Sequence, residues 1–278
     1  MTTHRAGLSV SSVDPQPTTL PELLGDLEAE HDDLDGLVAP LDEVGWDRQT
    51  PAPGWAVRDQ VSHLAYFDDA AVSAMTDPTA FAALVAAALA GGDPMEEHLR
   101  RGRSMPGTDL LRWWRASRTA MVTATSSLPA GARVPWFGPP MGALSFVSAR
   151  LMETWAHGQD VADALNIVRL PTARLRHIAH LGVRTRPFSY VVRNLEPPPT
   201  PVAVILAGPD GQTWAWDEGV VTDRVQGSAL DFCLVVTQRR NLADTDLVVQ
   251  GPEATQWMSI AQAFAGPPGP GRPVAVPH

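Results

Sequence analysis

The stretch ALSFVSARLMETWAHGQDVADALN, residues 143–166, decides the fold because it predicts a long helix with a polar pair inside an apolar pattern. Apolar and small residues recur every three or four positions, which is the spacing of one helix face. This stripe consists of Leu144, Val147, Leu151, Thr154, Gly158, Val161 and Leu165. Glu153 and His157 are one helical turn apart, so both side chains can point at the same atom.

Four other stretches carry a helical pattern, at residues 19–41, 56–76, 107–128 and 172–194. Long helices joined by short links favour a four-helix bundle with an added helix. The apolar stretch 81–92 is too short to span a bilayer, for which about 20 apolar residues are needed. We expect it to be a core helix or a helix that covers the bundle.

The proline-rich stretch LEPPPTPV, residues 195–202, is the expected boundary between two domains. Prolines at this density form a stiff, extended linker. The expected organisation is a disordered tail at 1–18, a helical bundle with a metal site at 19–194, the linker, and a small α+β domain at 203–278. The fold class is therefore α+β.

The pattern after the linker changes from helical to mixed. Strands are predicted at 202–208 and 213–219, where Pro-Asp-Gly-Gln at 209–212 reads as a hairpin turn. Two helices, at 228–240 and 253–266, and a strand at 245–251 follow. The last twelve residues are expected to be irregular.

The formal net charge is −10, which argues against nucleic acid and anionic membranes as partners because both require basic patches. Cys233 is the single cysteine, so an intramolecular disulfide and a Cys-rich zinc site are excluded. Its apolar neighbours predict a buried, unreactive thiol. With no stretch that resembles a signal peptide, we expect a cytoplasmic protein.

Glu153 and His157 alone would most often form an exposed contact pair on a helix surface. If their face turns inward, however, the carboxylate needs a partner or a cation. His63, on the predicted helix 56–76, supplies a third ligand if the two helices are neighbours. Two histidines and one carboxylate leave coordination positions open, as in a catalytic zinc site, although Fe²⁺ or Ni²⁺ would also fit.

Two stretches carry a resemblance to a known family. TPAPGWAVRDQVSHLAYFDD at 50–69 and RLMETWAHGQDVADAL at 150–165 resemble the signatures of the DinB-like, mycothiol-dependent maleylpyruvate isomerase family and its actinobacterial metal-binding subgroup. The resemblance covers about residues 20–190 and implies a DinB-like four-helix bundle. It also implies that His63, Glu153 and His157 hold the metal and that the thiol mycothiol is a cofactor.

We therefore expect a metal-dependent enzyme that acts on a small molecule with a metal-activated thiol or water, as a mycothiol-type isomerase or transferase. A metal-dependent hydrolase, or an enzyme of secondary metabolism, is one alternative. A non-catalytic small-molecule binding protein with a structural metal is another. The sequence names no catalytic residue, no thiol-binding residue and no oligomeric state.

Several residues near these signatures are candidates for supporting roles. Asp160 or Asp68 could accept a hydrogen bond from a ligand histidine. Trp55 and Trp155 are expected to pack against helices rather than line a pocket. Most of the arginines that follow or precede the site are expected on the surface, although one or two could bind a substrate carboxylate. These arginines are Arg150, Arg169, Arg174, Arg176, Arg184, Arg186 and Arg193, and the weaker metal pair is His177 and His180.

Overall fold

The computed structural model describes residues 18–90, 94–217, 219 and 222–275. The chain divides into two compact units. One unit, Thr18–Leu170, is helical and is called the helical unit below; the other contains the chain from Pro171 onward and is called the sheet unit. The expected tail at 1–18 lies outside the described residues except for Thr18.

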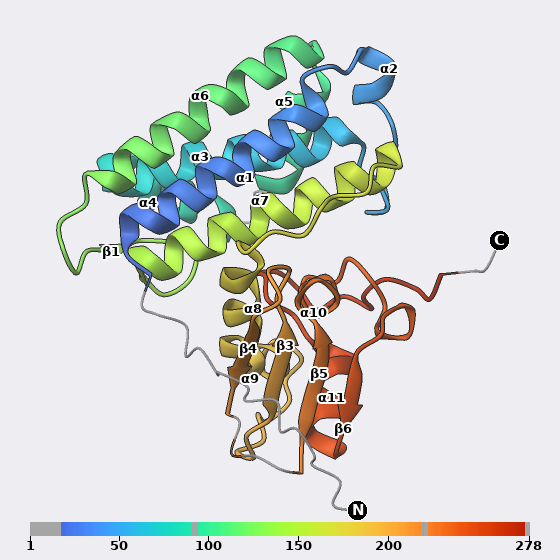
Figure 1. Cartoon of the computed structure of the whole chain (residues 1–278). Helices are drawn as coiled ribbons and strands as arrows, with labels where there is room; N and C mark the ends of the chain where they lie inside the picture. The colour runs from blue at the N-terminus through green and yellow to red at the C-terminus, as the bar shows by residue number, and fades with distance from the viewer. Residues whose placement is uncertain (1–17, 91–93, 218, 220–221, 276–278) are drawn as a thin grey trace, which may run out of the picture. The chain divides into compact units, whose positions relative to one another are not determined.

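Four long helices form the body of the helical unit and can be followed in Figure 1. They are α1 (Leu20–Val38), α3 (Val57–Thr76), α6 (Gly107–Ser126) and α7 (Ala143–Leu165). Helix α3 packs against α6 and α7, and α1 packs against the same two helices. The four expected helices therefore exist, and they close into a bundle in which α3 and α7 are neighbours.

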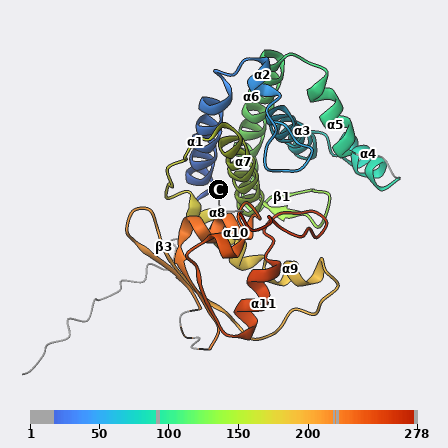
Figure 2. The ribbon, with the colours of Figure 1, turned by 90° about the vertical axis from the view of Figure 1, so that its right-hand side faces the viewer.

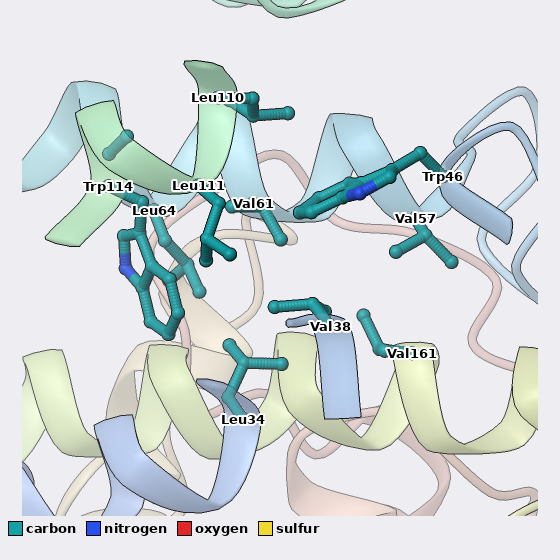
Figure 3. Packing of buried hydrophobic residues seen from close by; sticks show 11 residues of the cluster. Leu34, Val38, Trp46, Val57, Val61, Leu64, Leu110, Leu111, Trp114 and Val161 are labelled. Atoms are coloured by element: carbon teal, nitrogen blue, oxygen red, sulfur yellow. The ribbon is translucent and has the colours of Figure 1, made fainter. Parts of the chain in front are cut away.

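The core of this bundle is made from apolar residues of all four helices (Figure 3). Trp46 and Trp114 are its largest side chains, and both are almost fully buried. Around them pack Leu34, Val38, Val57, Val61, Leu64, Ala65, Leu110, Leu111 and Val161. Burial of this apolar stripe, rather than local helix propensity, supplies most of the stability of such helices.

Shorter elements connect the long helices. They are α2 (Glu43–Trp46), α4 (Pro78–Leu89), α5 (Pro94–Arg103), β1 (Arg133–Val134) and β2 (Met141–Gly142). Of the two interpretations of the stretch 81–92, the covering helix agrees with the structure and the core helix does not. Helix α4 packs against α3, Phe81 is its buried residue, and Leu89 is largely exposed. None of the described helices is long and apolar enough to cross a membrane.

The sheet unit contains a four-stranded mixed sheet with the strand order β4-β3-β5-β6. Its strands are β3 (Ala203–Ala207), β4 (Thr213–Trp216), β5 (Arg224–Ser228) and β6 (Val248–Gln250), and Figure 2 shows helices of the same unit packed on the sheet. The β3–β4 hairpin turns at the expected residues, where Gly211 adopts a left-handed φ of 79°. β5 pairs with β3 in parallel and was not expected. The α+β class is confirmed.

The helices of the sheet unit are α8 (Leu175–Arg184), α9 (Arg186–Val191), α10 (Ala229–Val236) and α11 (Pro252–Ile260), with a 3-10 turn at Leu242–Asp244. Helix α8 packs against α10, and α9 packs against α11. A Cβ atom on Gly182 would lie 2.8 Å from Val236 Cγ2, so the close approach of α8 to α10 requires glycine. Cys233 is buried in α10 as expected.

This arrangement corrects the expected boundary at 195–202. The chain from 172 to 194, expected as the added helix of the bundle, forms α8 and α9 and belongs to the sheet unit. The apolar face of α8 explains the difference. Its residues Leu175, Ile178 and Ala179 are buried, and the helix packs against α10 of the sheet unit. The division between the units falls at Leu170 and Pro171.

The buried His31 of α1 makes the stability of the protein depend on pH. Its ring meets Trp114 edge-on at 6.0 Å, and burial, with help from the charges of Arg118 and Arg150, lowers the pKa of His31 to about 3. The folded state therefore holds His31 neutral, whereas the unfolded chain takes up a proton near pH 6.5. The contribution of this residue is complete above pH 6.5 and is lost as the pH falls toward 3.

We expect His31 to cost about 2 kcal/mol of folding free energy when the pH is lowered from 7.5 to 5.0, from the difference between the two pKa values. Urea unfolding of the wild type and of His31→Leu at both pH values measures this cost. The variant should lose about 2 kcal/mol less than the wild type over this interval. Equal losses in the two proteins would show that His31 is not held neutral in the fold.

Candidate metal centre

Three ligand-type side chains converge between α3 and α7. One ligand atom from each of His63, Glu153 and His157 lies within 4.8 Å of the other two. His157 Nε2 is 3.3 Å from Glu153 Oε2, as expected for residues four apart on a helix. In the described part of the chain, these three residues form a group that could hold a metal ion. His63 and Glu153 are about 90 positions apart in the sequence, so the fold brings them together.

His63 is largely covered by its neighbours, among them the rings of Trp55 and Phe67. Burial, more than the nearby charges, holds the pKa of His63 well below its usual value, so the imidazole is neutral. Its Nδ1 is buried and has no hydrogen-bond partner among the described residues. A neutral imidazole with an unsatisfied buried nitrogen is costly without a ligand, and it is the form in which histidine binds a metal. His157 is also buried, and Glu153 is half-buried.

A chain of hydrogen bonds fixes the orientation of His157. Its Nδ1 lies in hydrogen-bond contact with Gln60 Oε1, an acceptor, so Nδ1 carries a proton. Gln60 Nε2 donates to Thr50 Oγ1 at 2.9 Å, and Thr50 donates to the carbonyl oxygen of Trp55 at 2.8 Å. When the ring is neutral, its free lone pair is then on Nε2, the nitrogen that faces Glu153.

Gln60 is predicted to support metal binding although it is not a ligand. Gln60→Leu removes the acceptor that orients His157, and we expect about 10- to 100-fold weaker divalent-metal binding, the usual effect of losing such a partner. Competition with a chromogenic chelator measures the affinity. Gln159→Leu is the control, since Gln159 lies on α7 but donates to Asp163. Equal metal affinities in the Gln60 and Gln159 variants would contradict the proposed orienting role.

The loop TPAPGW, residues 50–55, carries the first signature stretch into the site. The amide of Thr50 donates to the carbonyl of Trp55, and Gly54 adopts the left-handed φ of 77° that this tight loop requires. The Trp55 ring stacks on His157 at 5.9 Å and meets His63 at 5.4 Å. Trp55 therefore lines the site, contrary to the expectation that it only packs against helices, whereas Trp155 is buried beneath Arg169.

Helix α5 adds a histidine that the sequence analysis missed. Asp59 accepts a hydrogen bond from the amide of Ala56 at the start of α3, and it also forms an ion pair with Arg103 of α5 at 2.8 Å. The ion pair holds α5 against α3. His98 of α5 lies 5.3 Å from His63 and stacks on Tyr66 at 5.1 Å. The charge pattern of α5, with Glu96 early and arginines late, is a helix signal that could have identified it.

Aromatic rings continue from the histidines along the helical unit. Phe67 lies 4.6 Å from His63 and 5.8 Å from Phe137. Trp136 meets Phe67, and it also stacks on Phe81 at 6.0 Å. The candidate metal centre thus has an apolar, aromatic surrounding, which raises the strength of electrostatic interactions in the site.

The structure places the other candidate residues in different environments. Arg150 and Asp68 are both buried and form an ion pair at 2.8 Å, so neither is a surface group and Asp68 does not contact a ligand histidine. Asp160 is buried on α7. Arg169 pairs with Glu30 in the helical unit. His180 accepts a hydrogen bond from Trp216, and in the described structure His177 and His180 belong to no group of three or more ligand-type residues.

Comparison with protein families and curated proteins gives a match to one family model and to two curated proteins. The model of the family described as "Mycothiol maleylpyruvate isomerase N-terminal domain" matches residues 27–162. Two proteins of Mycobacterium tuberculosis, "Uncharacterized protein Rv0036c" of strain H37Rv and "Uncharacterized protein MT0041" of strain CDC 1551, are each 48% identical over 260 residues. Each match covers 93% of this chain and 99% of the relative.

Two solved structures share the fold. The crystal structure of the mycothiol-dependent maleylpyruvate isomerase superimposes with a TM-score of 0.56 and 15% identity, over 85% of this chain and 96% of that chain. A histidine-to-alanine mutant of that enzyme superimposes with a TM-score of 0.54 and 16% identity, over 80% of this chain and 90% of that chain. Both units of this protein therefore fall within the extent of the shared fold.

Proposed function

The chain belongs to the family of the mycothiol maleylpyruvate isomerase N-terminal domain, and from this premise we propose that it is a metal-dependent enzyme which uses a small thiol to isomerise or transfer a small molecule. The observation that carries the proposal is the convergence of His63, Glu153 and His157 inside an aromatic surrounding. The substrate is a small organic molecule, and mycothiol is the proposed thiol.

The three converging residues fit a divalent cation by their chemistry. Two imidazole nitrogens and one carboxylate oxygen suit Zn²⁺, which is our first choice, and they also suit Fe²⁺ or Ni²⁺. When bound, such a cation supplies Lewis acidity that lowers the pKa of a thiol or a water molecule. His63, Glu153 and His157 would hold it, with one negative charge from Glu153.

The remaining side chains of the site have roles that follow from their contacts. Gln60 holds the proton of His157 on Nδ1, so that Nε2 stays available. Trp55 and Phe67 cover the two histidines with apolar rings and reduce the access of water to them. The single thiol of the chain, Cys233, is buried, and burial raises its pKa well above the usual value, which makes an added thiol the better nucleophile.

Cobalt substitution tests whether a thiol binds at this centre. We expect Co²⁺-loaded protein to gain a sulfur-to-cobalt charge-transfer band when mycothiol is added, because a thiolate is a good ligand for this ion. The same titration with Glu153→Gln should give no band. Mycothiol that leaves the spectrum of the Co²⁺ protein unchanged would contradict the thiol-dependent reaction and favour the hydrolase.

Two alternatives give different results in the same preparation. A hydrolase would turn over ester or amide substrates without a thiol, because water would be the activated group. A non-catalytic binding protein with a structural metal would unfold when the metal is removed, because its binding free energy would be folding free energy. The buried single thiol suits a reducing compartment, so the proposal places the reaction in the cytoplasm.

A further inference from the structure

An array of aromatic rings extends from the candidate metal centre through the helical unit. It begins at His63, whose ring centroid lies 4.6 Å from that of Phe67. Phe67 in turn lies 6.2 Å from Trp136 and 5.8 Å from Phe137, both in the loop between β1 and β2. Five rings of this array are half-buried and are called the aromatic patch below: Trp55, Tyr66, Phe67, Trp136 and Phe137.

The aromatic patch differs from the bundle core in its exposure. Trp46 and Trp114, the large rings of the core, are almost fully buried, whereas each ring of the patch keeps part of its surface open. Contiguous apolar surface that a soluble protein leaves open marks a place where a ligand or partner binds. Because the patch adjoins the residues that would hold the metal, we expect its ligand to be the molecule on which the centre acts.

Two buried rings hold Trp136 in place. Trp136 stacks on Phe81 of α4 at 6.0 Å, with 13° between the ring planes, and Phe146 of α7 meets it edge-on at 5.1 Å. Phe81 and Phe146 are both almost fully buried. The loop that carries Trp136 is closed by the pairing of β1 with β2, and Arg133 donates to the carbonyl oxygen of Pro140. A ring that is already held loses little conformational freedom when a ligand stacks on it, which favours binding.

The charges near the centre disfavour an anionic group at this patch. Among the described residues of the helical unit, Arg150 is the arginine whose charge acts on His63. Arg150 is already paired, because its Nε and Nη2 donate to Asp68 Oδ1 at 3.1 and 2.8 Å. Glu153 adds a negative charge to the same centre, and like charges repel. The patch therefore suits an uncharged ring better than a second carboxylate.

We propose that the small molecule on which the centre acts carries an aromatic ring, and that this ring stacks on the open surface of the aromatic patch. The inference rests on the proposed function, because it takes the metal centre as the place of reaction. Offset-stacked and edge-to-face ring pairs gain free energy beyond the burial of their area. Trp55 and Phe67 contact the ligand-type histidines, so a ring bound against them lies beside the metal centre.

Isothermal titration calorimetry with two matched alcohols tests the proposal. The probes are 2-phenylethanol and 2-cyclohexylethanol, which differ in the aromaticity of the ring, and glutarate serves as the dicarboxylate. Burial of apolar area alone would favour the larger cyclohexyl ring. We expect saturable binding of 2-phenylethanol, about 2- to 10-fold tighter than that of 2-cyclohexylethanol, because aromatic pairs add to the area term. Glutarate should bind more weakly than either alcohol.

Two variants locate the binding at the patch. Trp136→Leu and Phe67→Leu each remove a ring but keep an apolar side chain, and they change two different elements, the β1–β2 loop and α3. Each should weaken the binding of 2-phenylethanol about 2- to 10-fold and change that of 2-cyclohexylethanol less. Urea unfolding of each variant confirms that the fold is retained.

Trp113→Leu is the matched control. Trp113 is a half-buried tryptophan of the same unit, but it donates to Asp69 and lies under Arg101, and it is not part of the aromatic patch. Its replacement should change the affinity for 2-phenylethanol less than about twofold, as for a site without shared contacts.

Several outcomes would overturn the proposal. They are the absence of saturable binding by 2-phenylethanol, equal or tighter binding of 2-cyclohexylethanol, glutarate binding as tight as that of 2-phenylethanol, or equal losses in the Trp136 and Trp113 variants. The titration is run on the full-length protein as purified and again after chelation of metal, so it does not depend on turnover. A cobalt charge-transfer band with mycothiol but no binding of 2-phenylethanol would refute this inference alone. Binding of 2-phenylethanol at the patch without that band would refute the thiol reaction instead.

Discussion

His63→Leu is expected to abolish measurable divalent-metal binding, with a loss of affinity of more than about 100-fold. This exceeds the range for a partner that only orients a ligand, because a direct donor atom is removed. The remaining Glu153 and His157 come from one turn of one helix and would bind a cation as an exposed i,i+4 pair does. Metal content of the purified protein, followed by chelator competition, gives the measurement.

The same variant should keep or slightly improve the stability of the metal-free protein. Leucine fills nearly the volume of the imidazole, and it removes a buried nitrogen that has no hydrogen-bond partner among the described residues. A urea titration in the presence of a chelator tests this. Metal loss with retained stability separates a functional metal from a structural one, since a structural metal contributes folding free energy.

His180→Leu is the matched control for this experiment. His180 is a histidine of the sheet unit that accepts a hydrogen bond from Trp216 and is not part of the metal-ligand group. Its replacement should leave the metal content unchanged. The metal-centre proposal would be refuted if the wild type binds every divalent metal with a Kd of about 1 mM or weaker, or if the His63 and His180 variants bind the metal equally well.

Much of the helical unit could be predicted from the sequence because each long helix carries its own apolar stripe. Helices α3 and α7 were expected within one residue of their observed bounds. The convergence of His63 on Glu153 required one further assumption, that the two helices are neighbours, and the spacing of side chains on a helix supplied the rest. The metal itself is still a prediction, since geometry alone does not bind an ion.

The residues that were missed share a physical reason. Gln60 contacts His157 across 97 positions of sequence, and nothing local to a glutamine in the middle of a helix shows what it will meet. Helix α8 has an apolar face, which predicts that the face is buried but not which element packs against it. Its partner, α10, is more than 40 residues further along the chain, so the pattern was assigned to the nearer bundle.

Strand β5 was missed for a more local reason. Its sequence RVQGS continues directly into α10, whose side-chain cap is Ser228, so one run holds both a strand and a helix start. A strand of five residues with a single fully buried side chain, Val225, gives little alternation to detect. Its parallel pairing with β3 is a tertiary feature, and it places β5 at the centre of the sheet.

Arg150→Met is expected to lower the free energy of unfolding by about 3–5 kcal/mol, the usual cost of leaving one member of a buried ion pair alone. Arg150 donates from Nε and Nη2 to Asp68 Oδ1 at 3.1 and 2.8 Å, and both side chains are almost fully buried. Burial raises the pKa of Asp68, and Arg150 opposes this rise. Without the guanidinium, the carboxylate must take up a proton or remain charged in the core.

The loss has a control and a consequence for the metal centre. Arg112→Met removes an arginine from the exposed pair with Asp109 and should cost less than about 1 kcal/mol. Arg150 and Glu153 are three residues apart on α7, and Asp68 lies five residues after His63 on α3, so the pair joins the two helices that carry the ligands. Adding Asp68→Leu to Arg150→Met should restore most of the stability, because no unpaired charge then remains. A double variant as unstable as the single one would show that the pair stabilises the fold through packing rather than through charge.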